Sequence, residues 1–342
     1  MSESSDVGPP TAIEQPPAGV DWQGALARIA GWGASILNGF VGDRLAERER
    51  PLAISMRLVG RKGEVALERR LRSQLGPVTG SICILVHGLA CNEQAWSWFH
   101  PENRDYGSLL QQDLGYTPLY LRYNSGRHVS DNGCELAQLI TALCAAWPVP
   151  IEQIVLIGHS LGGLVVRSAC HYGRLDGASW CHAVRRVFLL GTPNLGAPLE
   201  KLAELVSQTL KRIRNPYTYL VGGLLELRSS GIKDLRFGYL VDEEWRRTPE
   251  RPLRNNRLPI PLLPGASHYV LAGTLTEDVG HLVTRWFGDC LVRLPSATGQ
   301  EGSAERSIPF PRENCRVFPR LNHFDLIWHP EVYRQIRHWC GE

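Results

Sequence analysis

The segment Gly158-His159-Ser160-Leu161-Gly162-Gly163 decides the fold of this chain. The apolar run Ile154–Ile157 directly before it predicts a buried strand, and a helix is predicted from Leu161 to about Tyr172. A serine in the pattern G-x-S-x-G, between a strand and a helix, is typical of a tight turn that projects the hydroxyl from a sheet edge. The N-terminus of the following helix favours developing negative charge. The segment therefore predicts Ser160 as a nucleophile.

Other short apolar runs repeat the strand pattern on both sides of this segment. Helices are predicted between them, from near Asp131 to Trp147 and from Glu331 to Trp339. Strands that are apolar throughout and alternate with helices indicate an α/β fold with a mostly parallel, doubly wound sheet that is covered on both faces. The runs are Ile82–Val86, Leu119–Tyr123, Val187–Leu190, Tyr269–Ala272 and Val317–Phe318.

One long region interrupts the alternation, from about residue 195 to residue 264. It opens with an amphipathic helix that presents leucines between Leu199 and Ile213, and it ends in the basic, proline-rich stretch ERPLRNNRLPIPLLPG. An insertion of this size between two strands is usually a cap or lid. The leucines favour an apolar acyl chain as ligand, and the alternative interpretation is that they are ordinary core.

The N-terminal part divides into a tail and a helix ahead of the main domain, which we assign to residues 51–342. Residues 1–19 are polar and proline-rich, which predicts a disordered tail. Residues 20–50 form a predicted helical extension, with Asp21 as its cap and apolar residues at helical spacing from Trp22 to Phe40. The four glycines between Trp22 and Phe40, at positions 24, 31, 33 and 39, indicate close packing, because each costs about 1 kcal/mol relative to alanine in an unpacked helix. The helix either docks on its own domain or contacts a membrane surface or a partner.

Composition excludes several classes of protein. A hydrophobic content of 43% with 21% charged residues is ordinary for a globular chain, and no apolar run is long enough to span a membrane. The 37 basic and 34 acidic residues are scattered, so no nucleic-acid partner is expected. The 9 cysteines lack C-x-x-C pairs, and no secretory signal precedes them. Together these features predict a reduced, cytoplasmic protein.

An oxyanion at Ser160 needs two backbone N–H donors. One is expected from Leu161, directly after the nucleophile, and the other from the loop His87-Gly88-Leu89 that follows the first predicted strand. We assign the second donor to Leu89, because Gly88 lets the backbone approach closely.

The base is predicted to be His323. On a strand–turn–helix of this kind the acid and then the histidine follow the serine along the chain. Only His323 lies in a loop directly after a predicted strand and before the last helix. The other candidates for the base are His268, His281, His329 and His338.

The acid is expected after the strand that holds Tyr269–Ala272. The candidates are Glu277, Asp278 and Asp289, and Asp289 is favoured, with Asp278 as the alternative. Its role would be to hold the imidazole in the correct tautomer and to stabilise the imidazolium.

Further polar residues follow the strand ends, where open α/β sheets bind ligands. Arg122, Asn124 and His128 either line the site or close a polar loop. His159 is adjacent to Ser160, and because the turn points adjacent side chains apart, it is expected to be structural, with substrate contact as the alternative. His87 and His128 are expected to have structural or substrate-contact roles.

From about Ile82 to the C-terminus the chain resembles the α/β-hydrolase superfamily, in the branch of bacterial lipases and esterases that includes inositol-deacylase-like hydrolases. The resemblance implies an α/β-hydrolase fold and ester hydrolysis without a cofactor. Similar bacterial lipases carry the acid in a D-G-L-V setting and the base in an N-H-x-D setting, which implies Asp289 and His323. Cys290 stands where these relatives usually have glycine. The motifs are VHGLACNE (86–93), GHSLGG (158–163), LLGTPNLGAP (189–198), GDCLV (288–292) and LNHFD (321–325).

The resemblance also gives a candidate ligand for a structural calcium ion, because some similar lipases bind one through the aspartate two residues after the histidine. That residue is Asp325 here, and Asp278 is the candidate for a second carboxylate ligand. Two carboxylates do not make a six-ligand oxygen cage, so no metal is expected.

These patterns together predict a serine hydrolase that cleaves carboxylic esters, with lipids as candidate substrates, through Ser160, His323 and Asp289. Peripheral membrane contact would come through the N-terminal helix or the lid. Two alternatives stay open: acyl transfer to an acceptor other than water on the same fold, and a non-catalytic binding protein.

Overall fold

The computed structural model describes residues 22–47, 53–68, 70–98, 104–198, 229–246, 255–277, 288–300 and 306–341. Within these ranges one mixed sheet has the order β2-β1-β4-β3-β5-β6-β7-β8. The six strands from β4 to β8 in this order are parallel, and β1 pairs antiparallel with both β2 and β4. The strands are β1 (Arg57–Gly60), β2 (Gly63–Glu64), β3 (Ser81–Val86), β4 (Thr117–Arg122), β5 (Gln153–His159), β6 (Val184–Leu190), β7 (Ser267–Thr274) and β8 (Cys315–Pro319).

The central strands are buried on both faces, as their apolar sequences predict. On β3, Ile82, Ile84 and Val86 belong to one core cluster, whereas Cys83 and Leu85 belong to the other. The same alternation holds along β5 and β6. A strand buried on both sides needs no polar residue at every second position, which explains the continuous apolar runs.

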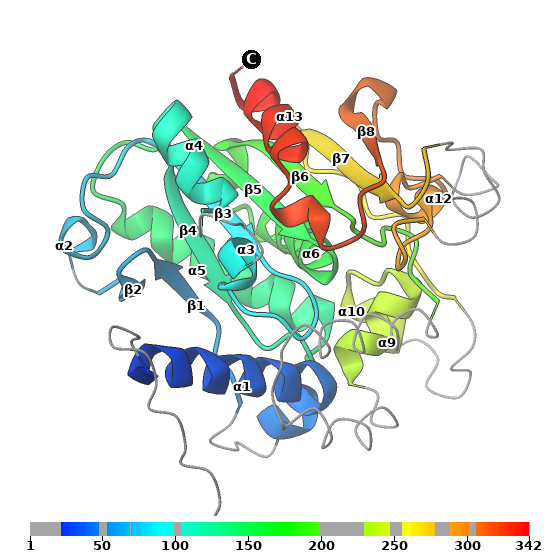
Figure 1. The fold of residues 1–342 in the computed structure, drawn as a ribbon, viewed down its shortest axis with the longest axis horizontal. Coiled ribbons are helices and arrows are strands. Elements are labelled where there is room, and N and C mark those ends of the chain that lie inside the picture. Colours follow the sequence, from blue (N-terminus) through cyan, green and yellow to red (C-terminus); the bar gives the residue numbers. More distant parts are fainter. Residues whose placement is uncertain are drawn as a thin grey trace, which may run out of the picture.

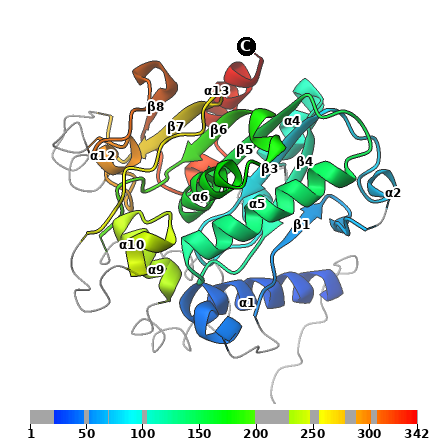
Figure 2. The ribbon, with the colours of Figure 1, turned by 180° about the vertical axis from the view of Figure 1, so that it is seen from behind.

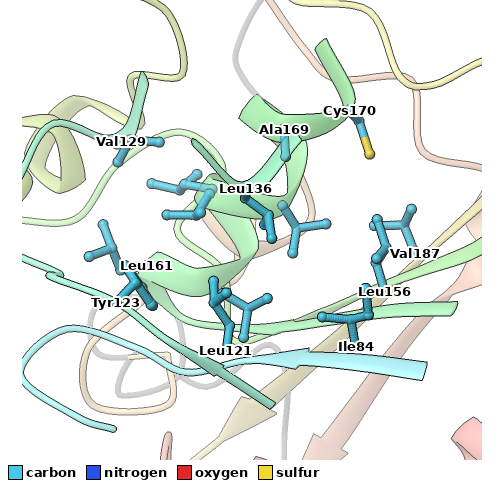
Figure 3. Packing of buried hydrophobic residues seen from close by; sticks show 14 of the residues in the cluster. Ile84, Leu121, Tyr123, Val129, Leu136, Leu156, Leu161, Ala169, Cys170 and Val187 are labelled. Atoms are coloured by element: carbon cyan, nitrogen blue, oxygen red, sulfur yellow. The ribbon is translucent and has the colours of Figure 1, made fainter. Parts of the chain in front are cut away.

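Two pairs of helices cover the sheet. Helices α4 (Tyr106–Leu114) and α13 (Pro330–Gly341) lie on one face, and α5 (Val129–Ala146) and α6 (Leu161–Leu175) lie on the other (Figures 1 and 2). Figure 3 shows the core under α5 and α6, where helix side chains meet those of the strands; the labelled strand residues are Ile84, Leu121, Leu156 and Val187, and the labelled helix residues include Leu136, Leu161 and Ala169.

The chain order makes β3 and β5 flank the topological switch point of the sheet. From β3 the chain moves to β4 on one side and then returns to β5 on the other side. Such a switch point leaves a crevice at the carboxyl ends of the two strands. Leu89 follows β3 and Ser160 follows β5, so the predicted oxyanion donor and the predicted nucleophile lie on its two sides.

Helix α1 (Trp22–Glu47) confirms the predicted N-terminal helix. Its side chains Trp32, Ile36 and Phe40 are buried against the domain, so the helix docks on its own chain. In both views α1 runs along one end of the molecule, beside β1 and α9 (Ser230–Phe237) (Figures 1 and 2). The predicted tail, residues 1–19, and Asp21 lie outside the described residues.

The predicted insertion at 195–264 is described only in part. It contains α9 and α10 (Asp242–Arg246), whereas the leucine-rich helix predicted between Leu199 and Ile213 lies outside the described residues. Two short helices, α2 (Leu71–Leu75) and α3 (Ala95–Trp98), and α12 (Leu294–Ala297) complete the α-helices of the described ranges, and the 3-10 turns are Ser179–His182, Arg312–Asn314 and Asp325–Ile327.

Two predictions from composition concern features that the structure describes, the cysteines and membrane-spanning helices. All 9 cysteines lie in the described ranges, no two of them form a disulfide bond, and each is buried or half-buried. No helix in the described ranges is both long enough and apolar enough to cross a membrane.

Candidate active site

Ser160 lies on the sharp turn that the sequence predicts between β5 and α6. Its backbone has φ 54° and ψ −123°, in the left-handed half of conformational space that non-glycine residues rarely adopt. Its N–H donates to the carbonyl of Leu190 at the end of β6 (2.9 Å). Strain of this kind costs about 1–3 kcal/mol and typically persists at functional sites.

Two glycines of the motif make this turn possible. A Cβ on Gly158 would lie 2.5 Å from the Cα of Gly163, and a Cβ on Gly162 would lie 2.3 Å from the carbonyl oxygen of Val86. The backbone of α6 therefore packs directly on β5 and β3 only because these positions have no side chain.

His323 and Asp289 form a buried pair. The Nδ1–H of His323 donates to Oδ2 of Asp289 at 2.8 Å, because a carboxylate can only accept, and each residue is 1% exposed. The two backbones are also joined, since the N–H of His323 donates to the carbonyl of Asp289 (3.0 Å). Chain order and resemblance both singled out these residues, and the structure brings them together.

The Asp289 carboxylate is held by the turn that follows it. Its Oδ1 accepts from the N–H of Leu291 (3.0 Å) and from the N–H of Val292 (2.8 Å). Cys290 inside this turn has φ 88°, a conformation that glycine adopts without strain. The turn geometry thus explains why glycine is usual at this position, and the cysteine adopts it nonetheless.

Ser160 and His323 lie against two consecutive residues, the last residue of β6 and the one that follows it. The N–H of Ser160 bonds to Leu190, and a Cβ on Gly191 would lie 2.9 Å from Nδ1 of His323 and 3.0 Å from its Cε1. His159 adds a further link, because its Nε2–H donates to the carbonyl of His323 (3.1 Å). The turn and the His323 loop therefore meet at the end of β6.

The second ring nitrogen of His323, Nε2, has no hydrogen-bond partner among the described residues. Since Nδ1 carries the proton donated to Asp289, Nε2 is a bare acceptor, and it is buried without a hydrogen bond from any described residue. Leaving a buried acceptor unsatisfied costs about 1–3 kcal/mol, so such atoms call for an explanation. The ring lies near the turn, because its centroid is 4.7 Å from that of His159, the residue before Ser160.

The two backbone N–H groups predicted to bind the oxyanion have no hydrogen-bond acceptor within the described ranges. Neither the N–H of Leu89 nor that of Leu161 donates to an acceptor in the described residues, whereas the N–H of Ala90 donates to Oγ of Ser125 (3.0 Å). The Leu89 loop reaches Ser160 because Gly88 has no side chain: a Cβ there would lie 3.1 Å from the Cβ of Ser160.

His87 and His159 are buried neutral bases near this loop. The ring of His87 stacks on Tyr123 at 4.4 Å, and its Nδ1–H donates to the Gly88 carbonyl (2.9 Å). Burial lowers the pKa of His87 to about 4 and lowers the pKa of His159 well below its ordinary value. Among the described residues, Nε2 of His87 has no hydrogen-bond partner.

The side chains of the polar loop after β4 bind other segments of the same chain. The amide of Asn124 donates to the carbonyl of Gly42 in α1 (2.9 Å), and its Oδ1 accepts from Gly126. His128 bonds to Asp234 of α9 (3.0 Å) and stacks on Trp245 of α10 at 3.8 Å. Arg122 pairs with Glu93. Of the two interpretations of this loop, these contacts favour a closed polar loop that fastens α1, α9 and the segment after Leu89.

The alternative bases and acids lie elsewhere or are not described. His268 is the second residue of β7 and its Nδ1–H donates to the carbonyl of Ala266. His329 directly precedes α13, and His338 lies within that helix. Glu277 pairs with Arg320 at the surface (2.6 Å). Asp278 and His281 lie outside the described residues.

Asp325, the calcium candidate, has a local role. Its Oδ2 accepts from the N–H of Asn322 (2.8 Å) in the turn that carries His323. In the described ranges no three histidines, cysteines or carboxylates gather as a metal site would require.

Comparison with known proteins matches residues 83–336 to the alpha/beta hydrolase family. The chain belongs to this family. The span of the α/β-hydrolase match contains Ser160, Asp289 and His323, whereas α1 precedes it. No curated protein matches the chain in sequence.

Solved structures similar to this α/β-hydrolase include lipases and esterases. The mature form of a Bacillus licheniformis lipase is 20% identical with a TM-score of 0.49, over 78% of this chain and 96% of that one. A Pyrococcus furiosus esterase is 12% identical with a TM-score of 0.43, over 77% and 81%. A malate-bound thermophilic esterase from Thermogutta terrifontis is 16% identical with a TM-score of 0.41, over 84% and 92%. At these identities the similarity concerns the fold.

Proposed function

We propose that this α/β-hydrolase cleaves carboxylic esters through an acyl-enzyme on Ser160, with His323 as the base and Asp289 as its partner. The observation that carries the proposal is the state of His323: Nδ1 is hydrogen-bonded to Asp289, Nε2 is buried with no hydrogen-bond partner among the described residues, and the ring lies beside His159 in the turn that bears Ser160. This is the arrangement that a general base requires before substrate binds.

The reaction follows from these groups. Nε2 of His323 takes the proton of the Ser160 hydroxyl as Oγ attacks the ester carbonyl, and the N–H groups of Leu89 and Leu161 stabilise the oxyanion. His323 then gives the proton to the leaving alcohol, which departs as the acyl-enzyme forms. Water attacks the acyl-enzyme with His323 again as base, and the acid is released with Ser160 regenerated.

We propose lipid esters as the substrate class. The support is the leucine-rich pattern between Leu199 and Ile213 in the sequence. The narrower resemblance to inositol-deacylase-like hydrolases stays a prediction, and the proposed reaction does not depend on it.

Hydrolysis of p-nitrophenyl esters from acetate to palmitate tests both parts of the proposal. We expect turnover that is highest for medium or long acyl chains, because an apolar acyl site contributes about 0.8 kcal/mol per buried methylene. A steep preference for acetate would contradict the lipid assignment and leave the esterase. Product that appears only when an alcohol acceptor is added would instead indicate acyl transfer, and no turnover under any condition would contradict the proposed function.

A further inference from the structure

Helix α1 precedes the span that matches the family, yet it touches the loop that carries the Leu89 amide. We propose that α1 is a positioning element of the oxyanion hole, and that Gly39 sets the place of the Leu89 N–H through Ala90. The inference rests on the proposed function, because it concerns how one of that reaction's two oxyanion donors is held.

The first connection is a direct backbone contact. A Cβ on Gly39 would lie 2.7 Å from the Cβ of Ala90, 2.8 Å from its Cα and 3.0 Å from its nitrogen. Ala90 directly follows Leu89 and has φ 58°, so it holds a strained conformation at the place where the helix meets it. Any side chain at Gly39 would therefore push on the residue bonded to Leu89.

The second connection runs through the loop after β4. Oγ of Ser125 accepts the N–H of Ala90 (3.0 Å). The neighbouring Gly126 lies against α1, because a Cβ there would be 2.0 Å from the carbonyl oxygen of Asn38, and Asn124 donates to the Gly42 carbonyl. Ala90 is thus braced by α1 directly and by a loop that α1 itself supports.

The helix is fixed from its other sides, so it can act as a support. Oγ of Ser229 donates to the carbonyl of Gly39 (2.7 Å), and Ser230 donates to Asp43 from both its N–H and its hydroxyl (2.9 Å each). Oδ1 of Asn38 accepts from the N–H of Ile54 (3.0 Å). Phe40 is buried in the same core as Leu89. A change at Gly39 therefore displaces the loop more readily than the helix.

The test compares Gly39→Ala with Gly33→Ala in the full-length enzyme. Gly33 is an exposed glycine of the same helix, and a Cβ there would have no neighbour within 4 Å. We expect Gly39→Ala to lower kcat about 10- to 100-fold with KM little changed, because a misplaced oxyanion donor is felt only in the transition state. Gly33→Ala should leave kcat unchanged, since alanine only improves the propensity of an exposed helix.

Ser125→Ala keeps the test decisive if Gly39→Ala does not fold. This variant adds no atoms and removes the acceptor of the Ala90 N–H, so a smaller decrease of kcat in the same direction is expected. A lower melting temperature with unchanged kcat in the folded variants, or an effect confined to KM, would overturn the proposal.

The outcome separates this inference from the proposed function. A fluorophosphonate should still label Ser160 of Gly39→Ala to completion, although more slowly, because the nucleophile and base remain in place. Wild-type enzyme that neither hydrolyses esters nor reacts with the probe would instead contradict the proposed function itself.

Discussion

Replacing His323 by alanine is expected to lower kcat for ester hydrolysis by about 10⁶, the loss seen when the histidine of a well-studied serine protease is removed. The reason is that nothing else described near the turn can take the Ser160 proton: Nε2 of His159 donates to a carbonyl, and burial keeps His87 a weak base with a pKa of about 4. Steady-state kinetics on the best p-nitrophenyl ester measures the loss.

The matched control is His182→Ala, because His182 is an exposed histidine at the end of a short 3-10 turn. Its kcat should equal that of the wild type. If His268→Ala or His281→Ala abolished activity while His323→Ala did not, the assignment of the base would be wrong.

Replacing Asp289 by asparagine is expected to lower kcat by about 10⁴ with the fold intact. Asparagine can still accept from the N–H groups of Leu291 and Val292 through its amide oxygen. The NH₂ group would then face Nδ1 of His323, which forces the ring proton onto Nε2, the atom that must be free to accept. Kinetics together with the melting temperature separates this tautomer effect from unfolding.

Asp325→Asn provides the control for that variant. Asp325 accepts one backbone N–H in the same turn as His323, so its replacement tests disturbance of the loop without touching the ring. Near-normal turnover of Asp289→Asn, with loss of activity in Asp278→Asn, would move the acid to the alternative residue.

The sheet could be predicted from the sequence where strands are buried on both faces. The continuous apolar runs at β3, β5 and β6 have no other simple explanation, and the structure confirms all three. The two strands β1 and β2 were not predicted. β2 is two exposed residues, and β1 is short, so neither leaves a periodic signal.

The contact between His323 and Asp289 was predictable because chain order limits the choice, although the residues are 34 positions apart. The partners of Asn124 and His128 were not. They come from α1 and α9, 82 and 106 positions away, and no local pattern indicates which distant helix meets a polar loop. Ser125 was missed for the same reason, since its role depends on the Ala90 N–H, 35 positions earlier.

Helix α1 shows what a sequence does and does not indicate about packing. Its glycines predict close approach, and Gly39 indeed meets Ala90, whereas a Cβ on Gly33 would have no neighbour within 4 Å. Gly42, which was not among the glycines singled out, meets Asn124. Composition alone does not distinguish a glycine that faces a neighbour from one that faces solvent.

The most direct test of the account is reaction of the full-length protein with a fluorophosphonate, followed by intact-mass measurement and peptide mapping. We predict a single adduct on Ser160 in the wild type and in Ser168→Ala, a buried serine of α6 whose hydroxyl donates to Leu240, and no adduct in Ser160→Ala. Labelling of Ser160→Ala to the wild-type level would contradict the assignment of Ser160 as the nucleophile.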